Sequence, residues 1–457
     1  MADSSTQGVL FAEPFDLPLV ARFDRPHASS DGGAILLKAA DRRLGLMGAL
    51  SNCLRDTRDP AKVRHGLDEL LGQRVYGLAC GYEDANDAAR LADDPIHKLL
   101  LGRDAINGEA LASQPTLSRF ENGVTRGELL RMSEALFETV LRRQGQRLRG
   151  KVHTLTLDLD VTDDPTHGQQ ELAFFHGHYG HWCYLPLLGY LTFNGEPEQH
   201  LVAAMLRPGK APTSLGALMM LRRIVGRLQE RFPRARILVR LDGGFAGPEL
   251  LEFLDEVEVD YVVGLPSNAV LAQAAAALLA PVRVRSEQTG ETEHEYGECR
   301  YAARTWDRER RVIIKAEVVQ HAGREMRDNP RFVVTNLKRA PRRVYERVYC
   351  QRGEIENRIK ELHHGLSLDR TSCTRFLANQ LRVLLTAAAY VLMQEIRAAA
   401  VRTSLARAQV GTLRERLFKL GAEVVVSVRR IVLHLPAAFP FVDEWRAVAV
   451  ALGAGSG

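Results

Sequence analysis

Residues 237–265 contain the pattern that most restricts the fold of this chain. An apolar segment, 237–242, ends in Asp242 and is followed directly by two glycines. Residues 248–256 then have the pattern of a short helix, and residues 261–265 form a second apolar segment. A strand, glycine turn, helix and strand in this order predict a βαβ unit. Such a unit exposes the carboxyl end of its first strand, so Asp242 stands where a site can form.

An earlier strand is predicted at residues 152–160. Three leucines alternate with polar residues there, which is the period of two expected for a β-strand. Asp158 and Asp160 share the polar face, and both are candidates for an acidic site residue. Asp160 is preferred because it stands at the end of the strand, whereas Asp163 and Asp164 are expected to be turn acids.

A third acidic residue lies on a segment with helical spacing, residues 349–363. Polar side chains recur there at steps of three and four, which predicts one stripe of an α-helix, and an apolar stripe has the same period. The stripe suits contact with an anionic partner, and the alternative is a solvated face with i,i+4 ion pairs. The polar stripe consists of Tyr349, Arg352, Glu356, Lys360 and His363.

Asp160, Asp242 and Glu356 together have the chemistry of a phosphoryl-transfer site. Mg²⁺ prefers oxygen ligands, and a set of carboxylates can flank or bridge two such ions. One ion would then activate the attacking oxygen while the other stabilises the leaving oxygen. The chain contains 56 acidic residues, and the spacing of these three alone would not distinguish them from the rest.

The remaining patterns predict an α/β protein with five segments. Helical patterns fill the first segment, and a short helix followed by antiparallel strands, including one at 282–287, fills the third. A long apolar helix is expected near 376–399, inside the fourth. The segments are residues 1–147, 148–270, 271–340, 341–399 and 400–457.

Composition restricts the class of protein further. With 46% hydrophobic and 26% charged residues the chain is typical of a soluble globular protein, and no uninterrupted apolar run reaches the roughly 18 residues that span a membrane. We therefore expect a cytoplasmic protein with no membrane partner. The six cysteines are scattered without a close pair, which argues against disulfides and a thiolate zinc site. Residues 338–352 contain six basic residues and one acid, which suits a phosphate backbone.

Several motifs together resemble the DDE transposases of bacterial insertion sequences, especially the branch with a Tyr-Arg-Glu-Lys signature. Asp160 is followed by Val-Thr, Asp242 begins Asp-Gly-Gly-Phe, and Tyr349 begins Tyr-x-x-Arg-x-x-x-Glu. Further strings are similar to one family within this group, and the resemblance covers nearly the whole chain. They are Thr162-Asp-Asp-Pro-Thr-His-Gly-Gln-Gln170, His176-Gly177, Tyr184-Leu-Pro-Leu187 and Gly81-Tyr-Glu-Asp-Ala-Asn-Asp87.

The resemblance implies a ribonuclease-H-like, mixed-sheet catalytic core with an antiparallel β insertion, preceded by an all-helical N-terminal DNA-binding domain. It implies Asp160, Asp242 and Glu356 as catalytic metal ligands for Mg²⁺, with Mn²⁺ as an expected substitute. It also implies cleavage at transposon inverted-repeat ends and strand transfer into target DNA. Because two ends must be brought together, we expect a homodimer or higher oligomer, which associates with the nucleoid when it is bound to DNA.

The same resemblance assigns DNA phosphate contacts to the helical stripe. Tyr349 and Arg352 would hold a phosphate beside the metal ions, Arg352 through its two-pronged guanidinium. The signature places a lysine seven residues after Glu356, but His363 stands there, so Lys360 is a second candidate for that contact.

His176, His178, His181 and Cys183 are dense enough to suggest a zinc site. However, the first two are two residues apart on an expected strand and no second ligand pair lies nearby, so an aromatic hairpin or a DNA-facing role is favoured. For the whole chain, two alternatives to a transposase remain open. One is a metal-dependent nuclease of the same fold without strand transfer, and the other is a non-catalytic DNA-binding regulator.

Overall fold

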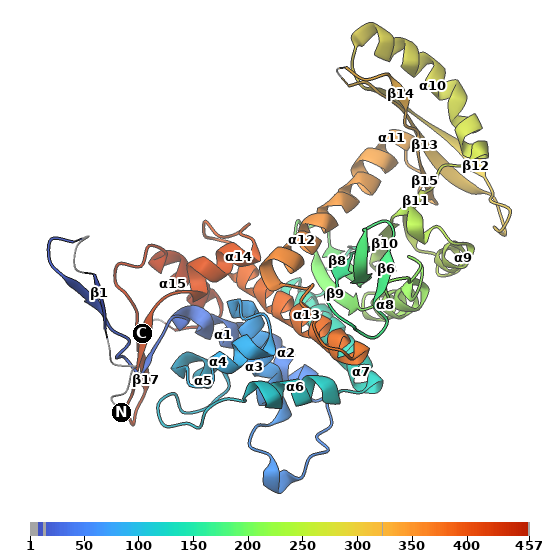
Figure 1. The fold of residues 1–457 in the computed structure, drawn as a ribbon. Helices are drawn as coiled ribbons and strands as arrows, with labels where there is room; N and C mark the ends of the chain where they lie inside the picture. The colour runs from blue at the N-terminus through green and yellow to red at the C-terminus, as the bar shows by residue number, and fades with distance from the viewer. Residues whose placement is uncertain (1–7, 12–14, 322, 456–457) are drawn as a thin grey trace. The chain divides into compact units, whose positions relative to one another are not determined.

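The chain folds into two compact units, which can be followed in Figure 1. Unit 1 combines Met1–Val124 with Ala388–Gly457, and unit 2 consists of Thr125–Ala387. Unit 2 is therefore continuous in sequence, whereas unit 1 is built from both ends of the chain. The computed structural model describes residues 8–11, 15–321 and 323–455.

Unit 2 is organised around a mixed β-sheet. Its strands are β4 (Thr154–Val161), β8 (Leu187–Phe193), β9 (His200–Met205), β10 (Arg236–Leu241), β11 (Asp260–Leu265), β12 (Glu293–Tyr301), β13 (Arg310–Val319), β14 (Arg327–Asp328) and β15 (Arg331–Thr335). They follow the order β12-β13-β15-β11-β10-β4-β8-β9, and β14 pairs with β13. The three central strands β11, β10 and β4 are parallel, and the remaining neighbours are antiparallel.

Strand β4 confirms the alternation predicted at residues 152–160. Its three leucines are fully buried on one face, and Asp158 and Asp160 are buried on the other. Both faces of the strand are therefore covered towards its end, as in the parallel part of a sheet with cover on each side. The acids of β4 consequently lie in a largely dry environment.

The predicted βαβ unit is present. Strand β10 ends one residue before Asp242, helix α9 (Pro248–Glu256) has the predicted bounds, and β11 follows. The other helices of unit 2 are α7 (Arg126–Arg147), α8 (Ala217–Arg231), α10 (Ala269–Thr289), α11 (Pro341–Val344), α12 (Glu354–Leu366) and the first part of α13 (Phe376–Ala399).

The strand predicted at 282–287 is wrong, because these residues complete the long helix α10. Ala-rich sequence favours a helix strongly enough to continue through Pro281, and Val282 faces inward with Leu271 and Leu279. The strands that follow are antiparallel, as the sequence predicts, and β12 pairs with β13 over nine residue pairs.

The helix predicted over 349–363 is not a regular α-helix. A π-helical turn, Tyr345–Tyr349, is followed by a 3₁₀ turn, Cys350–Gly353, and only then by α12. The change in hydrogen-bond pattern rotates side chains away from the positions that a 3.6-residue period gives. The prediction of one α-helical stripe from Tyr349 to His363 is therefore wrong for the part before α12.

Unit 1 is mostly helical but contains strands that the prediction of an all-helical N-terminal domain missed. A hairpin of β1 (Val9–Phe11) and β2 (Leu19–Ala21) precedes β3 (Ala28–Ser29), which pairs with β16 (Ala422–Val426), and β16 pairs with β17 (Ile431–His434). That prediction is thus wrong for residues 9–11, 19–21 and 28–29, which form strands. The helices of unit 1 include α1 (Ile35–Leu44), α2 (Leu46–Ser51), α3 (Leu67–Cys80), α4 (Ala85–Arg90), α5 (Pro95–Leu100), α6 (Gln114–Gly123), α14 (Val410–Leu413) and α15 (Val442–Ala451).

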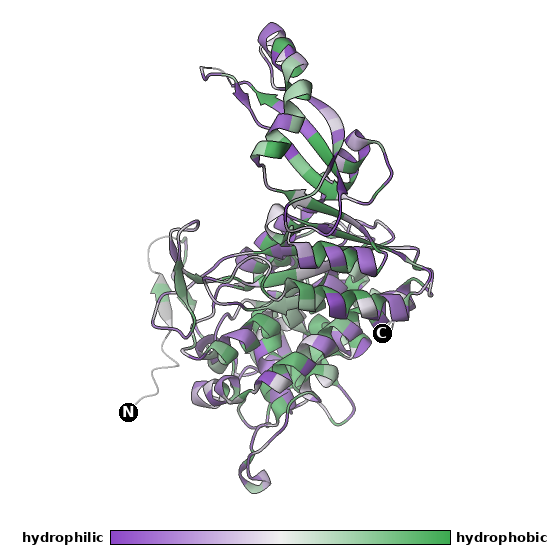
Figure 2. Cartoon of the chain, turned by 90° about the vertical axis from the view of Figure 1, so that its right-hand side faces the viewer, coloured by the Kyte–Doolittle hydropathy of each residue, from purple (hydrophilic) through white to green (hydrophobic). Residues whose placement is uncertain are grey.

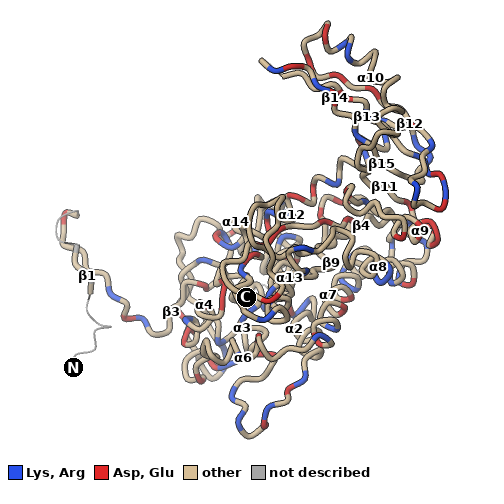
Figure 3. The backbone as a smooth tube through the Cα atoms, turned by 45° about the vertical axis from the view of Figure 1, so that its right-hand side comes forward, with Lys and Arg blue, Asp and Glu red and all other residues tan. Residues whose placement is uncertain are grey.

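Hydrophobic and polar residues share most helices, as the mixed green and purple ribbons of Figure 2 show. Acidic and basic residues both occur throughout each unit (Figure 3), so the small net charge of +5 reflects interspersed charges. Two helices, α10 and α13, are long and apolar enough to cross a membrane by length and composition. However, 78% of the apolar window of α13 is buried, as in a core helix of a globular protein.

Candidate active site

The carboxyl ends of β4 and β10 place two acids side by side. The strands are parallel neighbours, with Asp158 of β4 opposite Arg240 of β10, and Asp160 and Asp242 each stand two residues further on. Nη2 of Arg352 lies 3.3 Å from Oδ1 of Asp160 and 3.5 Å from Oδ2 of Asp242. One guanidinium group therefore spans the two acids that the sequence singled out.

Asp158, the rival candidate on β4, is occupied in a different way. Arg240 donates to its two carboxylate oxygens from Nε and Nη2, both at 2.7 Å, and Nη1 donates to the carbonyl of Val348 at 3.1 Å. Gln199 contacts the same carboxylate at 3.4 Å. Asp158 is thus the acid half of a buried ion pair.

Glu356 is the third acid of the candidate site. It lies in the first turn of α12 and is exposed. The pKa of Asp160 is raised to about 6, chiefly by burial, while the charge of Arg352 lowers it and the charges of Asp242 and Glu356 add to the rise. The carboxylate of Asp160 is therefore near enough to those of Asp242 and Glu356 to be repelled by both, and a cation beside it would relieve this repulsion. Hard divalent cations take carboxylate oxygens as ligands, so these residues fit a Mg²⁺-type ion.

Tyr349 is held against the turn that carries Asp242. A Cβ atom added to Gly264 of β11 would lie 2.6 Å from the Tyr349 hydroxyl, 2.7 Å from the Gly243 nitrogen and 3.1 Å from the Asp242 carbonyl carbon. Burial raises the pKa of Tyr349, with Arg352 and Asp242 among its charged neighbours. The hydroxyl therefore reaches the site only because position 264 has no side chain.

The other two residues of the predicted stripe differ from each other. His363 Nε2 lies 2.9 Å from the Thr162 hydroxyl, and Nδ1 lies 3.9 Å from Asp369. Lys360 is exposed, and no ion-pair partner is found for it in the described part of the chain. Of the two residues, Lys360 is the one whose charge is available to an outside group.

The loop after Asp160 is tied to three different segments. Thr162 contacts His363 of α12, as described above. Asp163 Oδ2 lies 2.9 Å from His181 Nε2, and the Thr371 hydroxyl donates to both oxygens of Asp164 at 2.9 and 2.8 Å. Asp163 and Asp164, expected as turn acids, therefore fix this loop in place.

Three of the four residues that suggested zinc, the histidines, gather around the ring of Tyr179. The hairpin of β6 (Phe174–His176) and β7 (His181–Tyr184) places the ring of Tyr179 5.0 Å from the rings of His176 and His178. The same tyrosine stacks on His181 at 6.1 Å, and Cys183 is buried in a small apolar cluster. Within the described residues, no metal-type ligand group is found at this hairpin.

A compact group of possible metal ligands does occur in unit 1. Ligand atoms of Asp31, Cys80 and His97 all lie within 4.8 Å of one another. However, Lys419 Nζ lies 2.7 Å from one oxygen of Asp31, and His97 Nε2 lies 2.9 Å from the other. The carboxylate already holds a cation, so the group is a buried polar network.

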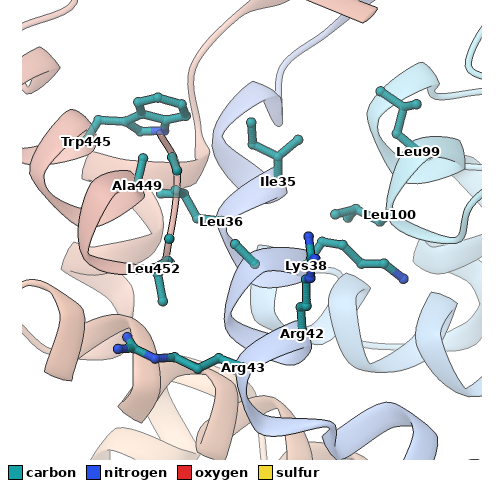
Figure 4. A pocket seen from close by; sticks show the side chains of 13 residues that line it. Ile35, Leu36, Lys38, Arg42, Arg43, Leu99, Leu100, Trp445, Ala449 and Leu452 are labelled. Carbon is teal, nitrogen blue, oxygen red and sulfur yellow. The ribbon is translucent and has the colours of Figure 1, made fainter. Parts of the chain in front are cut away.

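Unit 1 also contains a pocket of about 750 Å³ between α1, α5 and α15. Figure 4 shows Trp445 and Leu452 on the left, Leu99 and Leu100 on the right, and Ile35 of α1 between them. Its lining is largely apolar and includes none of the acids described above.

Two residues that position the site were not found from sequence. Arg240 could have been found, because a buried strand that contains an arginine needs an acid opposite it, and Asp158 is the paired residue in the neighbouring strand. Gly264 could not, because its role depends on the approach of Tyr349 from a distant segment.

Two acids at the ends of neighbouring strands and a third on a helix are residue types that can hold the metal ions of phosphoryl transfer. Residues 11–454 match the family described as transposase DDE domain group 1. The match covers nearly all of the chain, so the protein belongs to this family of DDE transposases. Family membership identifies an enzyme with nuclease and transesterase chemistry, and such enzymes generally use a divalent metal.

Among solved structures, the chain is similar to piggyBac transposase in a synaptic complex with hairpin DNA. The two chains are 8% identical with a TM-score of 0.41, and the alignment covers 90% of this chain and 82% of that one. The comparison with curated proteins gives no match.

Proposed function

We propose that this protein is the transposase of a bacterial insertion sequence, in the branch with the Tyr-Arg-Glu-Lys signature. It hydrolyses the phosphodiester bond at the inverted-repeat ends of the element and joins the freed 3′ hydroxyl to target DNA. The observation that carries this proposal is the junction of Asp160 and Asp242 through Arg352 at the ends of two parallel strands. The order β9-β8-β4-β10-β11 supports a ribonuclease-H-like core, because the first two pairings in it are antiparallel and the last two are parallel.

The acids have the role of metal ligands in this proposal. Asp160, Asp242 and Glu356 hold Mg²⁺, or Mn²⁺ in its place, and bound ions activate the attacking oxygen and stabilise the leaving oxygen. Burial of Asp160 keeps water away from its carboxylate, so ligands compete with little solvent. Asp158 has no place among the ligands, because Arg240 occupies both of its oxygens.

The phosphate contacts come from the segment that leads into α12 and from α12 itself. Arg352 has a buried Nε atom without a hydrogen-bond acceptor in the described part of the chain, which a phosphate oxygen would supply. Tyr349 offers its hydroxyl from above Gly264, and Lys360 offers an exposed ammonium group. His363 supports the loop after Asp160 through Thr162 and lies at the edge of this set.

The partners are transposon-end DNA and target DNA, and the working form is a homodimer or higher oligomer that brings two ends together. Lys338, Arg339, Arg343 and Arg347 are exposed just before the 3₁₀ turn, where they extend the phosphate-binding surface. The predicted DNA-binding role of residues 1–147 and the predicted cytoplasmic, nucleoid-associated location belong to the same proposal.

The test uses DNA that carries the inverted repeats flanking the gene. Asp160→Asn, Asp242→Asn and Glu356→Gln are each expected to abolish Mg²⁺-dependent cleavage while end binding persists. Full activity in any of the three variants would overturn the assignment.

The joined product separates the alternatives. Covalent joining of the end to a labelled target plasmid identifies a transposase, and cleavage without joining identifies a nuclease. A protein that binds ends but does not cleave them with Mg²⁺ or Mn²⁺ is a regulator.

A further inference from the structure

We propose that Arg352 is a built-in counter-ion, which occupies the gap between Asp160 and Asp242 in the metal-free protein and leaves it when a divalent cation binds. The inference rests on the proposed function, because it assumes that these acids are metal ligands. It assigns Arg352 a role before DNA arrives, in addition to a phosphate contact.

The position of the guanidinium group is the first support. A single nitrogen, Nη2, lies 3.3 Å from Asp160 and 3.5 Å from Asp242, so one positive charge is shared between the two carboxylates. Only 14% of the Arg352 side chain is exposed, so little water screens these charges. A metal ion needs the same two oxygens, which makes the two cations competitors for one place.

The second support is that the contact of Arg352 with Asp160 is weak. The neighbouring pair of Arg240 and Asp158 provides the comparison. Arg240 binds Asp158 through two hydrogen bonds of 2.7 Å, the geometry of a permanent fork. Arg352 makes one hydrogen bond of 3.3 Å to Asp160, and its buried Nε finds no acceptor in the described part of the chain. The first pair is saturated, whereas the second is loose and incomplete.

The backbone around Arg352 is the third support. The residue lies in a 3₁₀ turn between a π-helical turn and α12, and Gly353 follows it directly. Such irregular turns inside a helical run often mark hinges, since they can change their hydrogen-bond pattern with little cost. Arg352 can therefore move without disturbing α12.

The arrangement of the acids agrees with this role. Asp160, Asp242 and Glu356 are not among the ligand groups that close to within 4.8 Å in the described residues. Departure of the guanidinium group would let the carboxylates approach a common ion. The released group then carries its positive charge and its unused Nε donor to a DNA phosphate.

The test is Mn²⁺ binding to the full chain without DNA, measured by electron paramagnetic resonance at pH 8. Arg352→Met is expected to bind Mn²⁺ about tenfold more tightly than the wild type, because the competing cation is gone. Arg352→Lys, which keeps the positive charge, should bind Mn²⁺ with an affinity close to that of the wild type. Arg231→Met removes the same charge from an exposed position in the last turn of α8 and is expected to leave the affinity unchanged.

The possible outcomes separate the counter-ion role of Arg352 from the proposed metal site. Unchanged or weaker Mn²⁺ binding in Arg352→Met, with normal binding in the wild type, overturns the counter-ion role alone. If the wild type binds no Mn²⁺, or if Asp160→Asn and Asp242→Asn bind it as well as the wild type, the proposed metal site itself fails. Melting temperature without metal provides a second measurement: Arg352→Met should be less stable than the wild type and should gain more from added Mn²⁺.

Discussion

Arg240 and Asp158 form a two-point ion pair between neighbouring parallel strands, with side chains that are only 6% and 0% exposed. The pair stands two residues before the acids of the candidate site. It explains why two aspartates that share one face of β4 have different roles.

Removal of one partner of this ion pair should therefore lower the stability of the protein and should not act directly on the cleavage reaction. Asp158→Ala leaves a buried guanidinium group without its acid and is expected to lower the free energy of unfolding by about 3–5 kcal/mol, measured by urea denaturation. The double variant Asp158→Leu with Arg240→Met should recover most of the loss, since no buried charge remains. Asp160→Asn should fold with near wild-type stability, and wild-type stability in Asp158→Ala would contradict this division of roles.

Lys360 and His363 should respond differently to replacement by alanine. Lys360→Ala removes an exposed ammonium group and should weaken binding to end DNA while the slope of log affinity against log salt falls by about one. His363→Ala breaks the contact with Thr162 and should lower the melting temperature while the salt slope stays unchanged. The reverse result would assign the phosphate contact to His363.

Gly264 should tolerate no side chain. Gly264→Ala forces either the Tyr349 hydroxyl or the backbone at Asp242 to move, and overpacking of this kind costs about 1–3 kcal/mol. We expect lower stability and a loss of cleavage activity beyond the loss in Tyr349→Phe. Gly226→Ala in α8 provides the control, because a Cβ there meets no atom within 4 Å, and it should be neutral or stabilising. Normal cleavage by Gly264→Ala would show that the close approach is unimportant.

The stability of the protein should fall as pH rises from about 4 to about 8, in part because of Asp164. Burial raises the pKa of this acid from 3.8 to about 8, although the hydrogen bond from Thr371 opposes the shift. Below pH 4 both the folded and the unfolded states hold the proton, so the group costs nothing there. Between the two pKa values the unfolded state ionises while the folded state does not, so the free energy of unfolding falls by on the order of 5 kcal/mol.

Asp164→Asn keeps the shape of the side chain and cannot ionise. The variant should therefore match the wild type near pH 4 and exceed its free energy of unfolding at pH 8, measured by urea denaturation at both values. A difference between the two proteins that is independent of pH would exclude this explanation.

The central strands could be predicted because their patterns are local. A period of two gave β4, and the acid, glycines and short helix after β10 gave the βαβ unit. The strand predicted at residues 282–287 was wrong. Valine favours a strand in isolation, but the preceding alanines extend α10 through these residues. The π-helical and 3₁₀ turns before α12 were missed because an unbroken helical period does not reveal a change in hydrogen-bond pattern.

The candidate site was predictable in its residue types but not in its contacts. Two acids were named because each ends a strand, and the structure brings Asp160 and Asp242 together through Arg352. The pairing of Arg240 with Asp158 depends on which strands are neighbours. That order, like the close approach of Tyr349 to Gly264, is a property of the folded sheet and not of any one segment.

The pairing of β3 with β16 has a consequence for the order in which the chain can fold during synthesis. Ala28 pairs with Glu423 and Ser29 with Ala422. Strand β3 therefore cannot form its pairing until β16 has been synthesised, almost 400 residues later. Unit 2, which is continuous, can fold on the ribosome before then. A premature stop codon between residues 388 and 422 would therefore yield a chain that contains all of unit 2 and all three acids but only part of unit 1.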